Sequence, residues 1–378
     1  MIHLAILFEE GTNPIEFSYI RLRMAEEAVR TTIITMRAFS HLLEDRVNYG
    51  RADTFIDDVD IDGFDGVLIP GGTGPEKLRT DNKIVELVKR CYEKNKVCAA
   101  ICHGQQVFIS AGFMKGKKAT SAWSMMDDLR EVGAFVPEGE RVVRDENIVT
   151  AIFPNDLPEF CKTVLKTLSE TEGYSLTGGY PSRLEGQTWG MLADNAADSV
   201  QIKYLKPRFE EEGGRLLLLG RKAGMQIDLS SDLYEWGDMG MKAVIDCALP
   251  DSGTSDSCDN EAESNDHSIS SEQLDGIIIP GGLGISMLRG HKGFRRLARE
   301  MNEEGKPICT IERGAKALFM TGILKGRTIT CDARMKDDVI YSTENIKYSD
   351  ECCVVDGNII SCRGTDDIPL MMRKILAV

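Results

Sequence analysis

Cys102 and His103 are adjacent residues whose types and position could do chemistry together. They follow an apolar run at 97–101 and precede a helical stretch that ends near Gly112. A nucleophile on a sharp strand-to-helix turn stands exposed above its sheet, beside the free N–H groups of the first helical turn. Because a helix dipole favours thiolate, we expect a lowered pKa for Cys102. The neighbouring imidazole supplies a general acid or base near neutral pH.

An alternative interpretation makes Cys102 a core thiol and His103 an ordinary helix-start residue. The apolar strand before the pair and the Pro70-Gly71-Gly72 turn after another buried strand favour a site instead. Ligands of parallel sheets sit at the carboxyl ends of the strands, where both turns would lie. The base must be local, because no other histidine forms a His-x-Glu pattern for a distal triad; these are His3, His41, His267 and His291.

The elements that must position this pair alternate between strand and helix. Strands are expected at 4–8, 31–36, 66–69 and 97–101, and helices at 15–28, 81–95, 125–132 and 157–170. Apolar strands between helices, without strict alternation, indicate a mainly parallel sheet covered on both faces. The expected fold class is therefore α/β.

The same series of motifs returns about 210 residues later. Residues 66–79 (GVLIPGGTGPEKLR) match 276–289 (GIIIPGGLGISMLR), and 112–116 (GFMKG) matches 322–326 (GILKG). Such self-similarity indicates a duplication. We expect one domain at 1–170, an interdomain connector at 171–214 and a second domain at 215–378. Within the latter, the acidic run 251–272 is expected to be a disordered surface loop rather than an interaction tail, because it has too little apolar surface to offset the cost of ordering.

The second copy loses the nucleophile at its elbow. Glu312 and Arg313 stand in register with Cys102 and His103, and Cys309 lies three residues earlier, inside the strand. A buried thiol of that kind is inert. We therefore expect one working site per chain and a second copy that is a structural pseudo-domain, unless Glu312 and Arg313 bind a ligand of their own.

Composition excludes several classes of function. The formal net charge of −15 and a sequence pI near 5.0 argue against nucleic acid or an anionic membrane as partners. Residues 1–8 look like a first strand rather than a secretory leader, and no apolar run is long enough to span a bilayer. An odd count of eleven cysteines favours reduced thiols and a cytoplasmic protein. We expect no metal and no cofactor, because neither a paired Cys/His cluster nor a phosphate-cradling glycine motif is present.

The motifs around both turns resemble those of the PfpI/ThiJ superfamily, which has the class I glutamine amidotransferase-like fold. They are 67–72 (VLIPGG), 100–105 (AICHGQ) and 112–121 (GFMKGKKATS), and the tandem arrangement is similar to that of plant glyoxalase III-type proteins. The resemblance implies two tandem flavodoxin-like three-layer α/β/α sandwich domains. It also implies a carboxylate hydrogen-bonded to the elbow sulfur, which falls on Glu16; the matching position in the second copy is near Ile227 or Asp228.

Further site residues follow from the same resemblance. The turn at Gly71 and Gly72 would bind substrate, with the N–H groups of Gly72 and His103 as the oxyanion hole. In protease-like members a glutamate of the neighbouring subunit orients the histidine; its counterpart is Glu76, which implies a homo-oligomer. Where such members have Tyr-Pro, this chain has Ala122 and Trp123. We expect Trp123 to line the pocket.

Three functions fit these residues. The first is a cysteine-dependent, cofactor-independent enzyme on small 2-oxoaldehydes, glyoxalase III-like or deglycase-like, which converts methylglyoxal to lactate with Cys102 as nucleophile and His103 as acid/base. The second is a cysteine peptidase or amidase of the intracellular-protease type, which forms an acyl-enzyme. The third is a redox-responsive regulatory protein in which Cys102 is oxidised to sulfinate beside Glu16.

Overall fold

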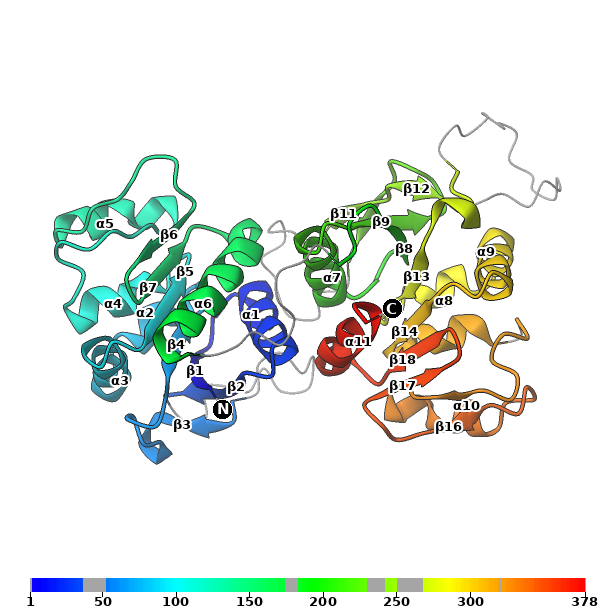
Figure 1. The fold of residues 1–378 in the computed structure, drawn as a ribbon, viewed down its shortest axis with the longest axis horizontal. Coiled ribbons are helices and arrows are strands. Elements are labelled where there is room, and N and C mark those ends of the chain that lie inside the picture. The colour runs from blue at the N-terminus through cyan, green and yellow to red at the C-terminus, as the bar shows by residue number, and fades with distance from the viewer. Residues whose placement is uncertain are drawn as a thin grey trace. The chain divides into compact units, whose positions relative to one another are not determined.

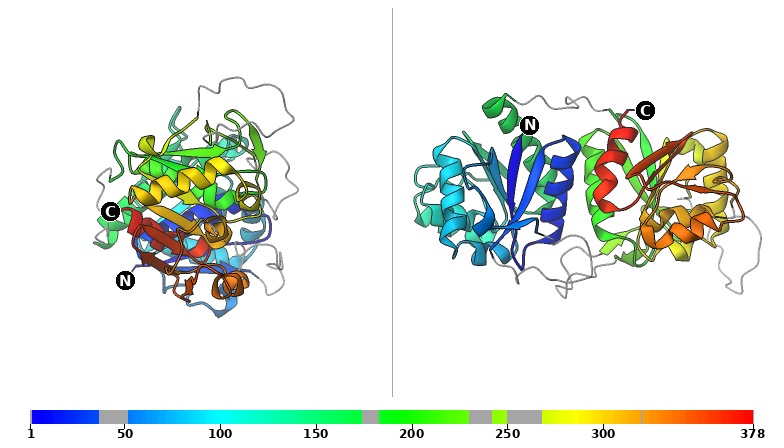
Figure 2. Two further views of the ribbon diagram at one scale, coloured as in Figure 1. Left: turned by 90° about the vertical axis from the view of Figure 1, so that its right-hand side faces the viewer. Right: turned by 90° about the horizontal axis from the view of Figure 1, so that it is seen from below.

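A computed structural model describes residues 2–36, 52–173, 183–229, 242–249, 268–319 and 321–377. The chain divides into two compact units, residues 1–179 and 180–378. Each unit contains a seven-stranded sheet with helices on both faces (Figures 1 and 2). The α/β class and the tandem sandwich expected from the sequence are confirmed.

The first copy has the strand order β3-β2-β1-β4-β5-β7-β6, in which β6 alone runs antiparallel to its neighbour. Helices α1 and α6 pack together on one face and α3 and α4 on the other. The elements are β1 His3–Leu7, α1 Pro14–Glu26, β2 Arg30–Thr35, β3 Thr54–Phe55, β4 Gly66–Ile69, α2 Gly74–Leu78, α3 Asn82–Glu93, β5 Val97–Ile101, α4 Gln105–Ala111, α5 Met126–Glu131, β6 Val142–Asp145, β7 Ile148–Ala151 and α6 Leu157–Glu172.

Central strands of this sheet are buried along their whole length. All five residues of β5 are buried between β4 and β7, which is why its sequence, VCAAI, is apolar without alternation. Helix α3 instead buries one stripe, with Ile84, Leu87, Val88 and Cys91 facing the sheet. The side chain of Asp81 caps its start by accepting two backbone N–H groups. The strand that precedes the elbow is thus fixed on both sides.

The second copy repeats this order as β12-β9-β8-β13-β14-β18-β17. Two further pairs, β10 with β11 and β15 with β16, lie outside its main sheet. The elements are β8 Thr188–Leu192, α7 Ser199–Glu211, β9 Arg215–Gly220, β10 Gln226–Asp228, β11 Lys242–Val244, β12 Cys247–Ala248, β13 Gly276–Ile279, α8 Ile285–Leu288, α9 Lys292–Glu303, β14 Ile308–Ile311, β15 Thr328–Ile329, α10 Lys336–Ile340, β16 Lys347–Tyr348, β17 Cys353–Asp356, β18 Ile359–Cys362 and α11 Ile368–Ile375.

The predicted connector, 171–214, is wrong. Strand β8 pairs with β9 and β13 in the middle of the second sheet, and α7 follows it, so most of the predicted connector is the first strand and helix of the second copy. The offset of 210 residues holds from β4 onward, but β8 begins only 185 residues after β1. The second copy therefore carries extra chain between its first helix and β13.

Part of that extra chain is the acidic run 251–272. Its residues 251–267 lie outside the described residues. The prediction of a disordered loop is wrong for 268–272, because Ser268 forms a β-bridge with Ala248 and Ser271 is buried in a 3₁₀ turn. A capping box between Ser270 and Gln273 starts that turn. No helix among the described residues is both long enough and apolar enough to cross a lipid bilayer.

Candidate active site

Cys102 occupies a strained turn between β5 and α4. Its φ of +61° is left-handed, a conformation that costs a residue with a Cβ about 1–3 kcal/mol and that collects at functional sites. The chain turns through 102–104 before α4 begins at Gln105. The strand-to-helix elbow predicted from the sequence is therefore present, with the thiol at its tip.

The turn at Gly71 and Gly72 packs directly against this elbow. A Cβ on Gly71 would lie 2.5 Å from the Cβ of Cys102 and 2.8 Å from the backbone nitrogen of His103, so only glycine permits the approach. Gly72 has a φ of +81°, which again favours glycine. The N–H groups of Gly72 and His103 both donate to the Cys102 sulfur. These two donors are the ones the sequence predicts for an oxyanion hole.

Glu16 reaches the same point from the first helix. The Asn13 side chain caps α1 by accepting the N–H groups of Ile15 and Glu16, which sets Glu16 in the first turn. Its side chain is fully buried, and Oε2 accepts the Gly71 N–H over 2.6 Å. Burial raises the pKa of Glu16 to about 7, although hydrogen bonds from Gly71 and Cys102 oppose the rise. The carboxyl group can therefore hold or release a proton near neutral pH.

The lowered pKa expected for Cys102 is wrong. Burial, reinforced by the negative charge of Glu16, raises the pKa of this thiol to about 12, while the N–H groups of Gly72 and His103 pull it the other way. The sequence argument counted only the helix dipole, but the thiol is 7% exposed and α4 is a short helix that begins three residues later. While Glu16 is ionised, Cys102 keeps its proton and needs a base to attack.

His103 is placed to be that base. Its Nδ1 lies 3.2 Å from the Cys102 sulfur, and its Nε2 lies 3.1 Å from the hydroxyl of Ser124. Burial lowers the pKa of His103, and the charge of Glu76 raises it less strongly, so the ring is neutral at neutral pH. Ser124 was missed by the sequence reasoning, because an exposed serine at the start of a helix carries no distinguishing pattern.

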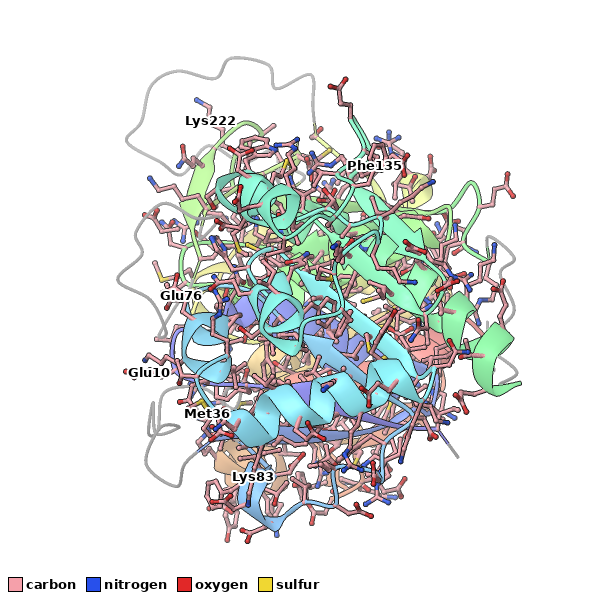
Figure 3. The ribbon with its side chains drawn as sticks, turned by 90° about the vertical axis from the view of Figure 1, so that its left-hand side faces the viewer. Glu10, Met36, Glu76, Lys83, Phe135 and Lys222 are labelled. Atoms are coloured by element: carbon pink, nitrogen blue, oxygen red, sulfur yellow. The ribbon has the colours of Figure 1, made fainter. Side chains whose placement is uncertain are left out.

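The other two predicted side chains lie further out. Glu76 is exposed on α2, and Figure 3 shows it at the outer edge of this copy, near Glu10. Its charge reaches His103, yet the two form no ion pair within the described part of the chain. Trp123 is 69% exposed and meets Phe153 edge-on, with ring centroids 4.9 Å apart. The structure thus brings Glu16, the two glycines, Cys102 and His103 together, with Glu76 and Trp123 outside this set of contacts.

The second copy reproduces the scaffold with different chemistry. Glu312 has a φ of +54° at the elbow, and the Gly281 N–H donates to Oε1 of Gln201 over 2.7 Å. Gln201 lies three residues after the N-cap Asp198 of α7, as Glu16 lies three residues after Asn13. Gln201 is therefore the counterpart of Glu16.

The prediction of Ile227 or Asp228 for this role is wrong. Both residues belong to β10, which pairs with β11 away from the main sheet. The error comes from applying the later offset of the repeat to its first helix.

The side chain of Glu312 is held by two arginines. Its Oε1 lies 3.1 Å from Nη2 of Arg334 and 3.5 Å from Nε of Arg313. Burial raises the pKa of Glu312, and the arginine charges oppose that rise. Cys309 is fully buried, and burial raises its pKa far above the ordinary value, as expected for an inert thiol. This elbow offers a carboxylate where the first copy offers sulfur.

Comparison with known proteins places these observations among relatives. The chain matches the DJ-1/PfpI family over residues 3–167 and again over 191–378. It is 26% identical over 337 residues to Protein DJ-1 homolog D of Arabidopsis thaliana, covering 88% of this chain and 81% of that protein. It is 35% identical over 164 residues to Deglycase TK1284 of Thermococcus kodakarensis (43% and 97%) and 38% identical over 118 residues to Deglycase PfpI of Pyrococcus furiosus (31% and 70%).

Proposed function

This chain belongs to the DJ-1/PfpI family, and from that premise we propose that it is a cysteine-dependent, cofactor-independent enzyme that acts on small 2-oxoaldehydes. Methylglyoxal would be converted to lactate at Cys102, and adducts of such aldehydes would be released by the same chemistry. The observation that carries the proposal is the 3.2 Å contact between the Cys102 sulfur and Nδ1 of His103, with the Glu16 carboxyl buried against the thiol. The deglycase names of two relatives support this class of substrate.

The first step uses the thiol and the imidazole. Cys102 sulfur forms a bond to the aldehyde carbon, and its proton passes to Nδ1 of His103 and on to the former carbonyl oxygen, which gives a hemithioacetal. Negative charge that develops on this oxygen meets the N–H groups of Gly72 and His103, which already donate to the sulfur. The neutral state of His103 suits this step, because a protonated ring could not accept the thiol proton.

The second step moves a proton between two carbons. His103 takes the hydrogen of the thiol-bearing carbon, and the electron pair shifts through an enediolate to the neighbouring ketone carbon, which is then protonated. The aldehyde carbon is thereby oxidised to a thioester, and the ketone carbon is reduced to an alcohol. Water hydrolyses the thioester, which releases lactate and restores the thiol. No electrons leave the substrate, so no redox partner is consumed.

Glu16 adjusts the thiol during this cycle. With a pKa raised to about 7, its carboxyl group changes charge in the range where the enzyme would work. When Glu16 is protonated, its charge no longer opposes ionisation of Cys102. The pair can therefore pass one proton between carboxyl group and sulfur as the substrate arrives and leaves.

We propose a cytoplasmic, homo-oligomeric protein. The described cysteines are all free thiols in this structure, which suits a reducing compartment. The exposed Glu76, whose charge reaches His103 without an ion pair, leaves room for a second chain beside the site.

The test is to incubate the protein with methylglyoxal and to follow lactate, with Cys102→Ala and Glu312→Ala variants alongside. The expected result is turnover by wild type and Glu312→Ala and none by Cys102→Ala. A folded wild type that makes no lactate would overturn the proposal. Cleavage of small fluorogenic peptides would then favour the peptidase, and sulfinate at Cys102 after mild peroxide without turnover would favour the redox-responsive protein.

A further inference from the structure

His103 has a second side-chain partner on the side of the ring away from the thiol. Nε2 lies 3.1 Å from the Ser124 hydroxyl, and Nδ1 lies 3.2 Å from the Cys102 sulfur. Ser124 is in the 3₁₀ turn Trp123–Met125 that leads into α5, 21 residues after His103. The imidazole therefore bridges a thiol and a hydroxyl that come from different elements.

The useful state of the ring is the tautomer with its hydrogen on Nε2. Only then does Nδ1 present a lone pair to the thiol or to a substrate C–H bond. An Nε2–H group needs an acceptor, and a serine oxygen can serve. A carboxylate in this place would also accept, but its charge would favour the imidazolium form, which cannot act as a base. A neutral acceptor orients the ring and leaves it basic.

The charged groups around His103 are consistent with this role. Glu76, from α2, raises the pKa of the ring through its charge alone, and within the described residues no carboxylate forms an ion pair with either ring nitrogen. Glu16, from α1, interacts with Cys102 rather than with the ring. Ser124 is thus the side chain that is in hydrogen-bonding contact with Nε2.

The second copy shows that this backbone position is aimed at the elbow. Arg334 lies 210 residues after Ser124, in the corresponding 3₁₀ turn Ala333–Met335. Its Nη2 lies 3.1 Å from Oε1 of Glu312, the residue that replaces Cys102. Both copies therefore use the same turn to reach the elbow, with a hydroxyl for an imidazole in one and a guanidinium for a carboxylate in the other.

We propose that Ser124 is the positioning residue of the first site: its hydroxyl accepts the Nε2–H of His103 and so turns the Nδ1 lone pair toward Cys102, without a charge that would hold the ring as imidazolium. The inference rests on the proposed 2-oxoaldehyde activity. Because Ser124 acts through His103, its loss should lower kcat for methylglyoxal while leaving KM nearly unchanged.

The experiment compares Ser124→Ala, Ser124→Thr and Ser124→Asp with wild type. We expect Ser124→Ala to lose about 10-fold in kcat, the effect of one hydrogen bond, and Ser124→Thr to restore most of it. Ser124→Asp should move the acidic limb of the pH–rate profile to higher pH, because its carboxylate stabilises the imidazolium. Ser169→Ala, a serine in the last turn of α6, is the matched control and should change none of these readings.

A second readout does not depend on turnover. With ¹⁵N-labelled histidine, the chain's five histidines give a simple spectrum, and His103→Gln assigns the His103 signals. We expect the Nε2–H tautomer in wild type and in Ser124→Thr, and a mixture of tautomers in Ser124→Ala. An unchanged tautomer and an unchanged kcat in Ser124→Ala would overturn the role of Ser124. A wild type without turnover whose tautomer still responds to Ser124→Ala would overturn the proposed function alone.

Discussion

The backbone N–H of Gly71 donates a 2.6 Å hydrogen bond to the carboxyl group of Glu16, 55 residues earlier in the chain. The corresponding bond in the second copy runs from Gly281 to Gln201 over 2.7 Å. A side-chain amide and a carboxyl group thus fill the same place in the same fold. The two copies differ here in a titratable proton and not in the scaffold.

Replacing Glu16 by glutamine should therefore keep the fold and remove the proton. Gln201 accepts the same kind of backbone N–H, so Glu16→Gln has an acceptor for Gly71. Without a carboxyl group beside Cys102 to exchange a proton, we expect kcat/KM for methylglyoxal to fall about 100-fold, the lower range of general acid–base effects. Steady-state kinetics and circular dichroism check this. Activity within a few-fold of wild type, with the fold intact, would contradict the role of Glu16.

The same variant predicts a pH dependence of stability. The pKa of Glu16 is raised from 4.5 to about 7 in the fold, so folding favours its protonated form. This stabilisation is fully present below the unfolded pKa and is lost as pH rises through the folded pKa. Such a shift corresponds to about 3 kcal/mol between pH 4.5 and pH 7.

Urea unfolding of wild type and Glu16→Gln over this range isolates the effect, because every other group is shared. The wild type should lose stability relative to the variant as pH rises from 4.5 to above 7. A difference that is independent of pH would mean that Glu16 does not bind a proton in the folded protein near neutrality.

Gly71→Ala should disturb the site and the fold together. The new methyl group would lie 2.5 Å from the Cβ of Cys102 and 2.9 Å from Oε2 of Glu16, and both neighbours are buried. We expect a loss of about 1–3 kcal/mol in the free energy of unfolding, as for an overpacked core, and strongly reduced turnover. The matched control is Gly112→Ala, where φ is +80° and no atom lies within 4 Å of the new methyl group. That variant should lose about 1 kcal/mol through backbone strain and keep its activity.

The second elbow should accept a rebuilt site. In a Cys102→Ala background, the changes Gln201→Glu, Glu312→Cys, Arg313→His and Arg334→Ser restore each polar group of the first copy. The left-handed φ of +54° at residue 312 is already that of the working elbow. We expect lactate formation to return above that of Cys102→Ala, and to disappear again when Gln201 is left unchanged. No recovery, with a folded second copy, would mean that further residues of the first copy are needed.

Much of the fold could be predicted because burial is written into its strands. The apolar run at 97–101 is observed as β5 with the same bounds, since a strand covered on both faces tolerates no polar residue. Strand β8 was missed because Trp189 and Gly190 interrupt a short apolar segment. A Cβ on Gly190 would meet the Leu219 side chain, so this glycine answers to packing against β9, which lies further along the chain.

The site was predicted where residues are adjacent or tied to a motif, and missed where they meet only in space. Cys102, His103 and the two glycines lie within motifs, and the resemblance supplied Glu16. Ser124 and Gln201 lie in turns whose direction depends on the whole sheet. The pKa of Cys102 was judged wrongly because a sequence reveals the helix after the thiol but not the depth of its burial.

The central claim is that each chain forms one covalent intermediate, on Cys102. Its most direct test is to quench the reaction with methylglyoxal in acid during turnover and to map the modified peptides by mass spectrometry. We expect one substrate-derived three-carbon unit per chain on the peptide that contains Cys102, and none on the peptide that contains Glu312 and Arg313. Steady lactate production by Cys102→Ala, or turnover by wild type with Cys102 unmodified throughout, would contradict the claim.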